Sequence, residues 1–258
     1  MYKRNEQSDY SPEKSKQQFI YGIHPVEEAI KSGKEIEKIF LQNGLRNDAI
    51  NAVFRLVREN QIPFQYVPVE KLNRLKPNVN HQGVIASLSN ISYQPFEEVL
   101  TSVFEKGENP YFLILDRITD VRNIGAIART AECTGVHAII VPATNSALIN
   151  SDAIKSSAGA LLRVPICRNA NLKNVIFYLK ESGLQIVAAT EKSSKDFFKV
   201  DFTKPTAVIM GSEEDGISNE YLKLSDERVK IPMAGEISSL NVSVACGIVL
   251  FEGLKQRL

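Results

Sequence analysis

The sequence predicts an α/β protein of two units, the second of which is built on a parallel sheet. From residue 111 onward, apolar runs of strand length alternate with segments of helical periodicity, the pattern of a parallel sheet covered on both faces. Residues 19–91 show a smaller version of the same alternation. The segment between them, residues 92–110, carries two prolines and a glycine and is predicted to be a linker. A chain of 258 residues, 43% hydrophobic and 24% charged, suits two modest globular domains.

The first unit is predicted to begin after a tail. Residues 1–18 contain no Ile, Leu, Val or Phe, so they cannot bury enough apolar area to offset the cost of ordering, and we expect a flexible tail. The spacing of Ile50, Val53 and Val57 places apolar side chains on one face of a helix. The unit is predicted to contain strands at 19–22, 36–41, 64–67 and 84–88, and helices at 25–31 and 47–59.

The second unit is predicted over residues 111–258. Its expected strands are 111–115, 137–141, 163–167, 184–189, 206–210 and 228–231. Its expected helices are 123–134, 151–160, 171–182 and 217–224, with a last helix after Asn241.

Several classes of protein are disfavoured by composition. No segment approaches the roughly 18 consecutive apolar residues of a membrane helix, and the N-terminus lacks the apolar core of a signal peptide, so we expect a cytoplasmic protein that contacts no membrane. The three cysteines are far apart and the three histidines form no ligand pattern, so no metal centre is predicted. The net charge is +1, so any surface for nucleic acid must be local.

Asp116–Ala131 is the first segment with chemical character. It follows the apolar strand at 111–115 and runs into a helix that we expect to begin near Asn123, with Arg129 less than two turns further on. In open α/β sheets, ligands bind beyond the carboxyl ends of the strands. The alternative is a helix cap followed by a surface arginine.

Met210–Ile217 is the second segment, and it places three acidic residues in one turn. Its spacing does not match a calcium loop and no His or Cys lies nearby, so a metal site is disfavoured. We favour a turn between Gly211 and Gly216 whose backbone binds a small ligand, with Glu213 fixing the turn or an arginine. The alternative is a solvated turn.

The third segment comprises Ile231–Met233 and Ser238–Ser243. Asn241 or Ser239 is a natural N-cap of the last helix. Small polar residues at a helix start that we expect to be buried need hydrogen-bond partners, which a polar ligand could supply; self-capping is the alternative. Three such segments, each at a predicted strand end, indicate one site.

Together the three segments resemble the SpoU/TrmH family of ribose 2′-O-methyltransferases, in the SPOUT class. The matching positions are Asn123, Gly125 and Arg129 in the first segment, Gly211, Glu213 and Gly216 in the second, and Ile231, Pro232, Ser239, Leu240, Asn241 and Ser243 in the third. Tyr21–Ala29 and His81–Gly83 resemble the start and the end of the family's ribosomal-protein-like substrate-binding domain. The chain departs from the family at Val121, where a proline is common.

The resemblance implies a C-terminal trefoil knot and a homodimer with each active site near the subunit interface. It implies transfer of a methyl group from S-adenosylmethionine to a ribose 2′-hydroxyl of RNA, with large-subunit ribosomal RNA favoured as the target over transfer RNA. The implied cofactor-binding residues are Ala189, Thr190, Gly211, Ile231 and Leu240, and the implied catalytic residues are Arg129, Asn123, Glu213, Ser239 and Asn241.

The role of Arg129 stays open at this stage. The family assigns it action on the 2′-hydroxyl, but a guanidinium has a pKa above about 12 and is a poor base. Binding an RNA phosphate and stabilising a developing alkoxide fit its chemistry better.

Two other classes of function are also open. A non-catalytic RNA-binding factor for ribosome assembly could share this fold. A nucleotide-dependent Rossmann enzyme is disfavoured because the G-x-G-x-x-G fingerprint is absent.

Overall fold

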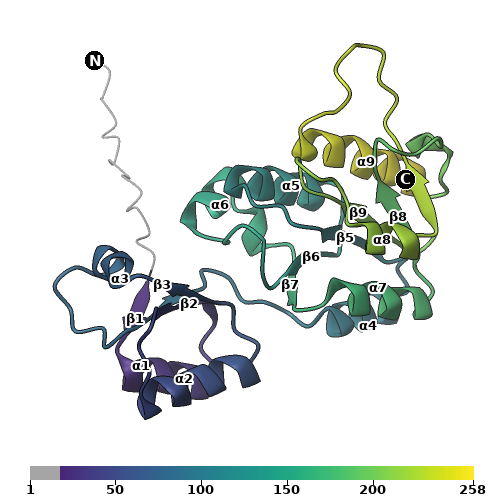
Figure 1. The fold of residues 1–258 in the computed structure, drawn as a ribbon. Helices are drawn as coiled ribbons and strands as arrows, with labels where there is room; N and C mark the ends of the chain where they lie inside the picture. The colour runs from purple at the N-terminus through teal and green to yellow at the C-terminus, as the bar shows by residue number, and fades with distance from the viewer. Residues whose placement is uncertain (1–17) are drawn as a thin grey trace, which may run out of the picture.

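The computed structural model describes residues 18–258, which form a small mixed sheet followed by a larger parallel one (Figure 1). The predicted fold class is confirmed. The tail expected over residues 1–18 lies, apart from Gln18, outside the described residues. Within residues 18–258, no helix is long and apolar enough to cross a membrane.

The first sheet has the strand order β1-β4-β2-β3, with β2 and β3 parallel and the other neighbours antiparallel. Helices α1 and α2 cover one face through Val26, Val53 and Val57, and α3 covers part of the other through Leu72. The elements are β1 Phe19–Tyr21, α1 Ile23–Lys31, β2 Ile36–Gln42, α2 Asp48–Glu59, β3 Phe64–Val67, α3 Val69–Leu75 and β4 Val84–Leu88. The sequence reading did not anticipate α3.

The second sheet is six-stranded and parallel, in the order β10-β8-β9-β5-β6-β7. Its strands are β5 Tyr111–Leu115, β6 Ala138–Pro142, β7 Ile166–Asn169, β8 Gln185–Ala189, β9 Thr206–Met210 and β10 Glu227–Val229. Central strands β5 and β9 are buried along their whole length, as expected of a sheet covered on both faces. The chain runs β5-β6-β7 towards one edge and then crosses to β8 on the other side of β9.

Helices cover both faces of this sheet (Figure 1). On one face α5, α6 and α9 enclose Leu113 and Val208, and on the other α4, α7 and α8 enclose Phe112 and Ile209. The helices are α4 Phe96–Glu105, α5 Val121–Cys133, α6 Ser151–Ser156, α7 Leu172–Glu181, α8 Asn219–Leu224 and α9 Val242–Arg257, with 3₁₀ turns at Ala160–Leu162 and Phe197–Lys199.

Several element boundaries differ from the sequence prediction: the helix expected at 151–160 ends at Ser156, and two further differences have a clear local cause. The first helix of the second unit begins at Val121 rather than near Asn123, because the Asp120 carboxylate accepts a hydrogen bond from the Arg122 N–H and caps it. The strand expected at 163–167 begins only at Ile166, because a 3₁₀ turn precedes it after Gly159, which has φ +86°.

The stretch expected as a linker, residues 92–110, contains helix α4. Phe96, Val99, Leu100 and Val103 of this helix are buried against Phe112 and the rest of that sheet face. Only the residues between β4 and α4 therefore connect the two sheets. The trefoil knot stays a prediction.

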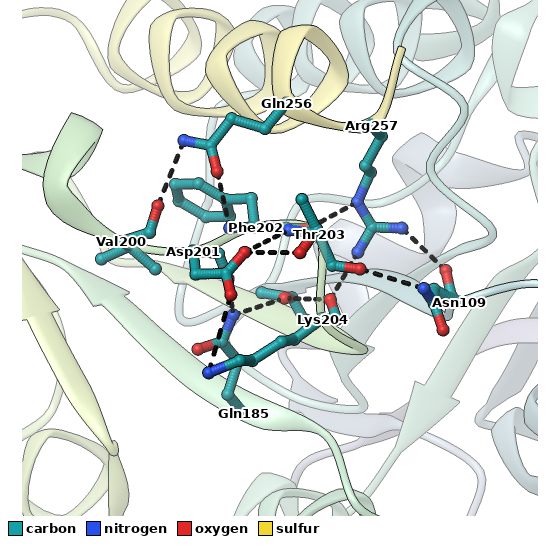
Figure 2. Close-up of polar contacts among 10 residues, drawn as sticks. Asn109, Gln185, Val200, Asp201, Phe202, Thr203, Lys204, Gln256 and Arg257 are labelled. Atoms are coloured by element: carbon teal, nitrogen blue, oxygen red, sulfur yellow. Dashed lines mark hydrogen bonds and ion pairs between the residues drawn. The ribbon is translucent and has the colours of Figure 1, made fainter.

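The C-terminal end of α9 is anchored at the amino edge of the sheet (Figure 2). Arg257 donates hydrogen bonds to the main-chain carbonyls of Phe202, Asn109, Pro110 and Lys204 at 2.7–3.2 Å. Its guanidinium carbon also lies 4.4 Å from the ring centre of Tyr111. Four of the five N–H groups of this cation therefore donate to the protein's own backbone.

Candidate active site

The predicted site residues other than Arg129 gather near the carboxyl ends of four adjacent strands. Asp116 follows β5, Gly211 follows β9, Thr190 follows β8 and Lys230 follows β10. These ends lie at one edge because all six strands run in the same direction. This is the edge at which open parallel sheets bind ligands.

A triangle of polar side chains joins the three sequence segments. The amide nitrogen of Asn123 donates to Glu213 Oε1 at 3.1 Å. The amide nitrogen of Asn241 donates to the same carboxylate oxygen at 2.5 Å and to Asn123 Oδ1 at 3.1 Å. The structure thus brings together one residue from each segment, although they lie far apart in the sequence.

Asn241 is also the N-cap of α9, one of the two residues, with Ser239, that the sequence offered for this role. Its side-chain oxygen accepts hydrogen bonds from the N–H of Ser243 at 3.0 Å and from the Ser243 hydroxyl at 2.5 Å. One amide side chain therefore starts the helix with its oxygen and orients Glu213 with its nitrogen. The expected burial of this helix start is wrong: Ser238, Ser239 and Asn241 are exposed, because the loop between β10 and α9 projects from the sheet (Figure 1).

The turn that carries Glu213 is held by two residues to which the sequence reading gave no role. Asp116, 2% exposed, accepts hydrogen bonds from both the N–H and the hydroxyl of Ser218 at 2.7 Å. Arg117 contacts Asp116, donates to Asp215 at 3.0 Å and donates to the Gly216 carbonyl at 3.1 Å. Hydrogen bonding to Asp116 raises the pKa of Arg117. Their position at the end of a buried strand was the signal available in the sequence.

Gly211 and Gly125 are needed for close packing. A Cβ at Gly211 would overlap the backbone of Gly216 and Ile217, so the turn closes only over glycine. A Cβ at Gly125 would overlap the Ser156 side chain and approach the Ala153 carbonyl at 2.9 Å, so this glycine lets α5 lie against α6. Both matched motif glycines thus serve the shape of the site.

A cleft beside the triangle brings together the predicted cofactor-binding residues. One cavity of about 100 Å³ is lined by Ala189, Thr190, Ile231 and Leu240 among others, and it includes Ser239. An adjoining cavity of about 560 Å³ shares Ala189, Ser239 and Leu240 and adds Gly211 and Asn241. Within the described chain, the backbone N–H groups of Ile231 and of residues 233–240 donate to no other main-chain group. Apolar walls and unpaired backbone groups suit a purine nucleoside, whose ring is apolar on its faces and polar at its edge.

A second pocket, of about 310 Å³, lies on the other side of Glu213. Asn123, Glu213 and Asp120 line it, and so does Asn145 from the loop after β6. Glu213 and Val242 line both this pocket and the larger cavity of the cleft. The two spaces are therefore neighbours, as a donor site and an acceptor site must be.

Arg129 lies apart from the triangle. It is exposed on α5, and none of its nitrogen atoms has an acceptor or an acidic partner within residues 18–258. It lines neither the cleft nor the pocket of Asn123 and Glu213. One chain thus assembles Asn123, Glu213, Ser239 and Asn241 but does not bring Arg129 to them. In the same range, no group of three His, Cys, Asp or Glu residues could hold a metal ion.

Family comparisons cover almost all of the two units. Residues 110–251 match the SpoU rRNA Methylase family, and residues 19–94 match the RNA 2′-O ribose methyltransferase substrate-binding family. YacO of Bacillus subtilis, placed in the TrmH family of tRNA/rRNA methyltransferases, is 32% identical over 93% of this chain and 96% of its own length. The 23S rRNA (guanosine-2′-O-)-methyltransferase RlmB of Vibrio parahaemolyticus is 36% identical over 93% and 98%.

Solved structures agree with this assignment. The SpoU methyltransferase AviRb of Streptomyces viridochromogenes, solved with the cofactor AdoMet, aligns with a TM-score of 0.59 and 26% identity over 93% of this chain and 90% of its own. The TrmH/SpoU tRNA-modifying enzyme of A. aeolicus aligns with a TM-score of 0.54 and 34% identity over 62% and 83%.

Proposed function

The chain belongs to the SpoU family of S-adenosylmethionine-dependent RNA 2′-O-ribose methyltransferases, and we propose that its target is a ribose of large-subunit ribosomal RNA. The proposal for the target rests on how much of this chain each relative matches. The 23S rRNA methyltransferase of Vibrio parahaemolyticus matches both units of this chain, whereas the tRNA-modifying enzyme of A. aeolicus covers 62% of it. The tRNA enzyme matches less of this chain, so we infer that it does without one of the two units. Such an additional unit fits the recognition of a larger RNA.

S-adenosylmethionine, when bound, supplies a methyl group already activated on a sulfonium centre. We propose that the chain holds it in the cleft of Ala189, Thr190, Gly211, Ile231 and Leu240. The free backbone groups of residues 231–240 would pair with the edge of the adenine, and Leu240 and Ile231 would flank its faces. Positioning of this kind can supply up to about 7–11 kcal/mol of a reaction's barrier.

The acceptor ribose would enter the pocket lined by Asn123, Glu213 and Asn145, next to the cleft. Glu213 is already oriented by two amide nitrogens, those of Asn123 and Asn241. It can therefore accept a hydrogen bond from a ribose hydroxyl without first reorganising. Ser239 lines the cleft on the other side and would orient the groups that react.

Arg129 would act from the subunit interface of a homodimer. Helix α9 packs on α5 with one side, and on its other side Val244 and Phe251 are 50% and 52% exposed. A symmetric partner that covered these side chains would place the unpaired Arg129 cation beside an interface, where it could bind an RNA phosphate and stabilise the developing 2′-alkoxide. Sedimentation at micromolar concentration tests this directly: a species near the chain mass of 28.7 kDa alone would contradict it.

The decisive experiment for the target is a map of ribose methylation. Total RNA from a strain lacking this protein is compared with RNA from the parent strain and from the strain complemented with the wild type or with Arg129→Ala. We expect one 2′-O-methyl mark in large-subunit ribosomal RNA to disappear and to return only with the wild type. Loss of a mark from transfer RNA instead would overturn the proposed target.

A further inference from the structure

Glu37 is a buried carboxylate whose side-chain partners all lie outside its own unit. It sits on β2 of the first sheet and is 5% exposed. One oxygen accepts a hydrogen bond from the Tyr93 hydroxyl at 2.6 Å, and the other accepts from the N–H of Ile149 at 3.3 Å. Arg168 completes an ion pair at 3.6 Å. A buried charge is retained only where it is paired, so these contacts define where the two units must meet.

Arg168 holds the same junction from the opposite side. It lies on β7, the edge strand of the second sheet, and donates to the main-chain carbonyls of Ile36 at 3.0 Å and Glu37 at 3.3 Å. Its guanidinium carbon lies 4.0 Å from the ring centre of Tyr93. A planar cation that bonds two carbonyls and stacks on a ring fixes orientation as well as distance.

Tyr93 belongs to the connection between the units, and this connection is itself tied down. The N–H of Gln94 donates to the Ile166 carbonyl at 2.9 Å, and Tyr93 forms a parallel bridge with Ile166 beside β7. Burial, reinforced by the charge of Glu37, raises the pKa of Tyr93, so its hydroxyl stays protonated and keeps donating to Glu37. The connection is therefore held to the edge strand β7 by one isolated bridge and one main-chain hydrogen bond.

The junction adjoins the proposed acceptor pocket. A cavity of about 320 Å³ lies at it, lined by Lys38 and Gln65 from the first sheet and by Arg168 and Asn145 from the second. Asn145 lines the pocket of Asn123 and Glu213 as well. Any change in the angle between the units therefore changes the opening next to that pocket.

We propose that Glu37, Tyr93 and Arg168 are positioning residues that lock the substrate-binding unit against the methyltransferase unit and so set which ribose reaches the acceptor pocket. The inference rests on the proposed function in one respect: the measurement of methyl transfer requires that the protein methylate RNA. Replacing such a network by apolar residues often leaves stability unchanged, so its value here is geometric.

The experiment measures the distance between the units in the full chain. Spin labels are placed at Glu59→Cys on α2 and Lys173→Cys on α7, two exposed positions, in a Cys133→Ser background. The other two cysteines stay unlabelled, because burial raises the pKa of Cys167 and of Cys246 to about 12. The network variants are Arg168→Gln, Tyr93→Phe and Glu37→Gln.

The matched control is Arg163→Gln, which removes an exposed arginine close in sequence whose one ion pair, with Glu132, is 3.6 Å long. We expect one narrow distance distribution for the wild type and for the control, and a broadened one for Arg168→Gln. Arg168→Lys, which keeps the charge but loses the planar fork, should broaden it less. Unchanged distributions in all three network variants would overturn the inference.

Methyl transfer supplies the second readout. With the RNA substrate of the wild type, KM for RNA should rise at least about tenfold in Arg168→Gln, the loss expected for one charge-assisted hydrogen bond. The single-turnover rate at saturating RNA should change less than about twofold, cofactor affinity should not change, and neighbouring riboses should become methylated. A fall in that rate with KM unchanged would contradict a positioning role. If the wild type methylates no RNA, the proposed function is wrong. The distance measurement still tests whether Glu37, Tyr93 and Arg168 hold the two units in one orientation.

Discussion

The two ends of α9 are built for opposite purposes. At its C-terminal end, Arg257 has four carbonyl partners and an aromatic ring, all supplied by backbone or core (Figure 2). At its N-terminal end, Asn241 is exposed, and nine of the ten residues before it, all but Pro232, carry N–H groups that no other main-chain group accepts. One helix thus connects an anchored end to an end that is preceded by a loop with unpaired N–H groups. The contrast indicates that stability and chemistry can be changed separately at the two ends.

The sharpest test of that separation is Arg129→Ala. We expect methyl transfer to fall by about 10²–10³, the usual cost of removing one preorganised electrostatic group, because the exposed cation has no structural partner to lose. The melting temperature and the affinity for S-adenosylmethionine should not change. Arg129→Lys should be partly active, since it keeps the charge without the planar fork. A wild-type single-turnover rate with saturating RNA would remove Arg129 from the chemistry.

Arg257→Ala should have the reverse profile. It removes the one donor to the Phe202 and Asn109 carbonyls, whereas Thr206 still donates to the carbonyls of Pro110 and Lys204; with the lost stacking on Tyr111 this costs about 3 kcal/mol, the upper end of the usual range. At about 2–4 °C per kcal/mol, the melting temperature should fall by roughly 6–12 °C, while cofactor affinity at 20 °C stays within about twofold. Arg163→Ala is the matched control, because this exposed arginine has only one long ion pair. Equal melting temperatures for the two variants would show that the anchor is dispensable.

Gly211→Ala should disturb the open edge through the fold of one turn. The added methyl overlaps the Gly216 and Ile217 backbone, and such overpacking costs about 1–3 kcal/mol. Because Glu213 belongs to the same turn, cofactor affinity should fall about tenfold, measured by calorimetry. Gly247→Ala in α9 is the control, since a Cβ there meets only the Thr130 side chain, at 3.7 Å. If both variants bind the cofactor like the wild type, the turn does not shape the cleft.

The smallest effect is expected at the cysteines, one of which is in α9 itself. Burial raises the pKa of Cys246 and of Cys167 to about 12, whereas Cys133 is exposed. At pH 8 a thiol reagent should therefore modify one thiol per folded chain and three after denaturation. Because the folded-state pKa values exceed the unfolded ones, stability should fall as pH rises from about 9 towards 12. Rapid modification of all three thiols at pH 8 would show that the middle of α9 opens.

Much of this molecule follows from local patterns. Apolar runs and their spacing identified every strand of both sheets to within a few residues, since burial on both faces leaves a continuous hydrophobic signature. The cap of α9 was narrowed to Asn241 or Ser239, because capping is an interaction between residues two or three apart, and the structure shows Asn241. Asp120 was missed as the cap of α5, although its sequence signal was equally local, because Asn123 competed for the same position.

Tertiary structure decided what depends on contacts between distant residues. Asn123 and Glu213 lie 90 positions apart in the sequence, and Ile149 and Glu37 lie 112 positions apart. Sequence periodicity therefore could not predict that either pair is in contact. Helix α4 was predicted to be part of a linker, because the role of its apolar face can be recognised only together with the sheet that it covers. The position of Arg129 outside the pocket is likewise a property of how α5 packs. Sequence fixes which side chains are available at each strand end, whereas the packing of two sheets and their helices determines which of them meet.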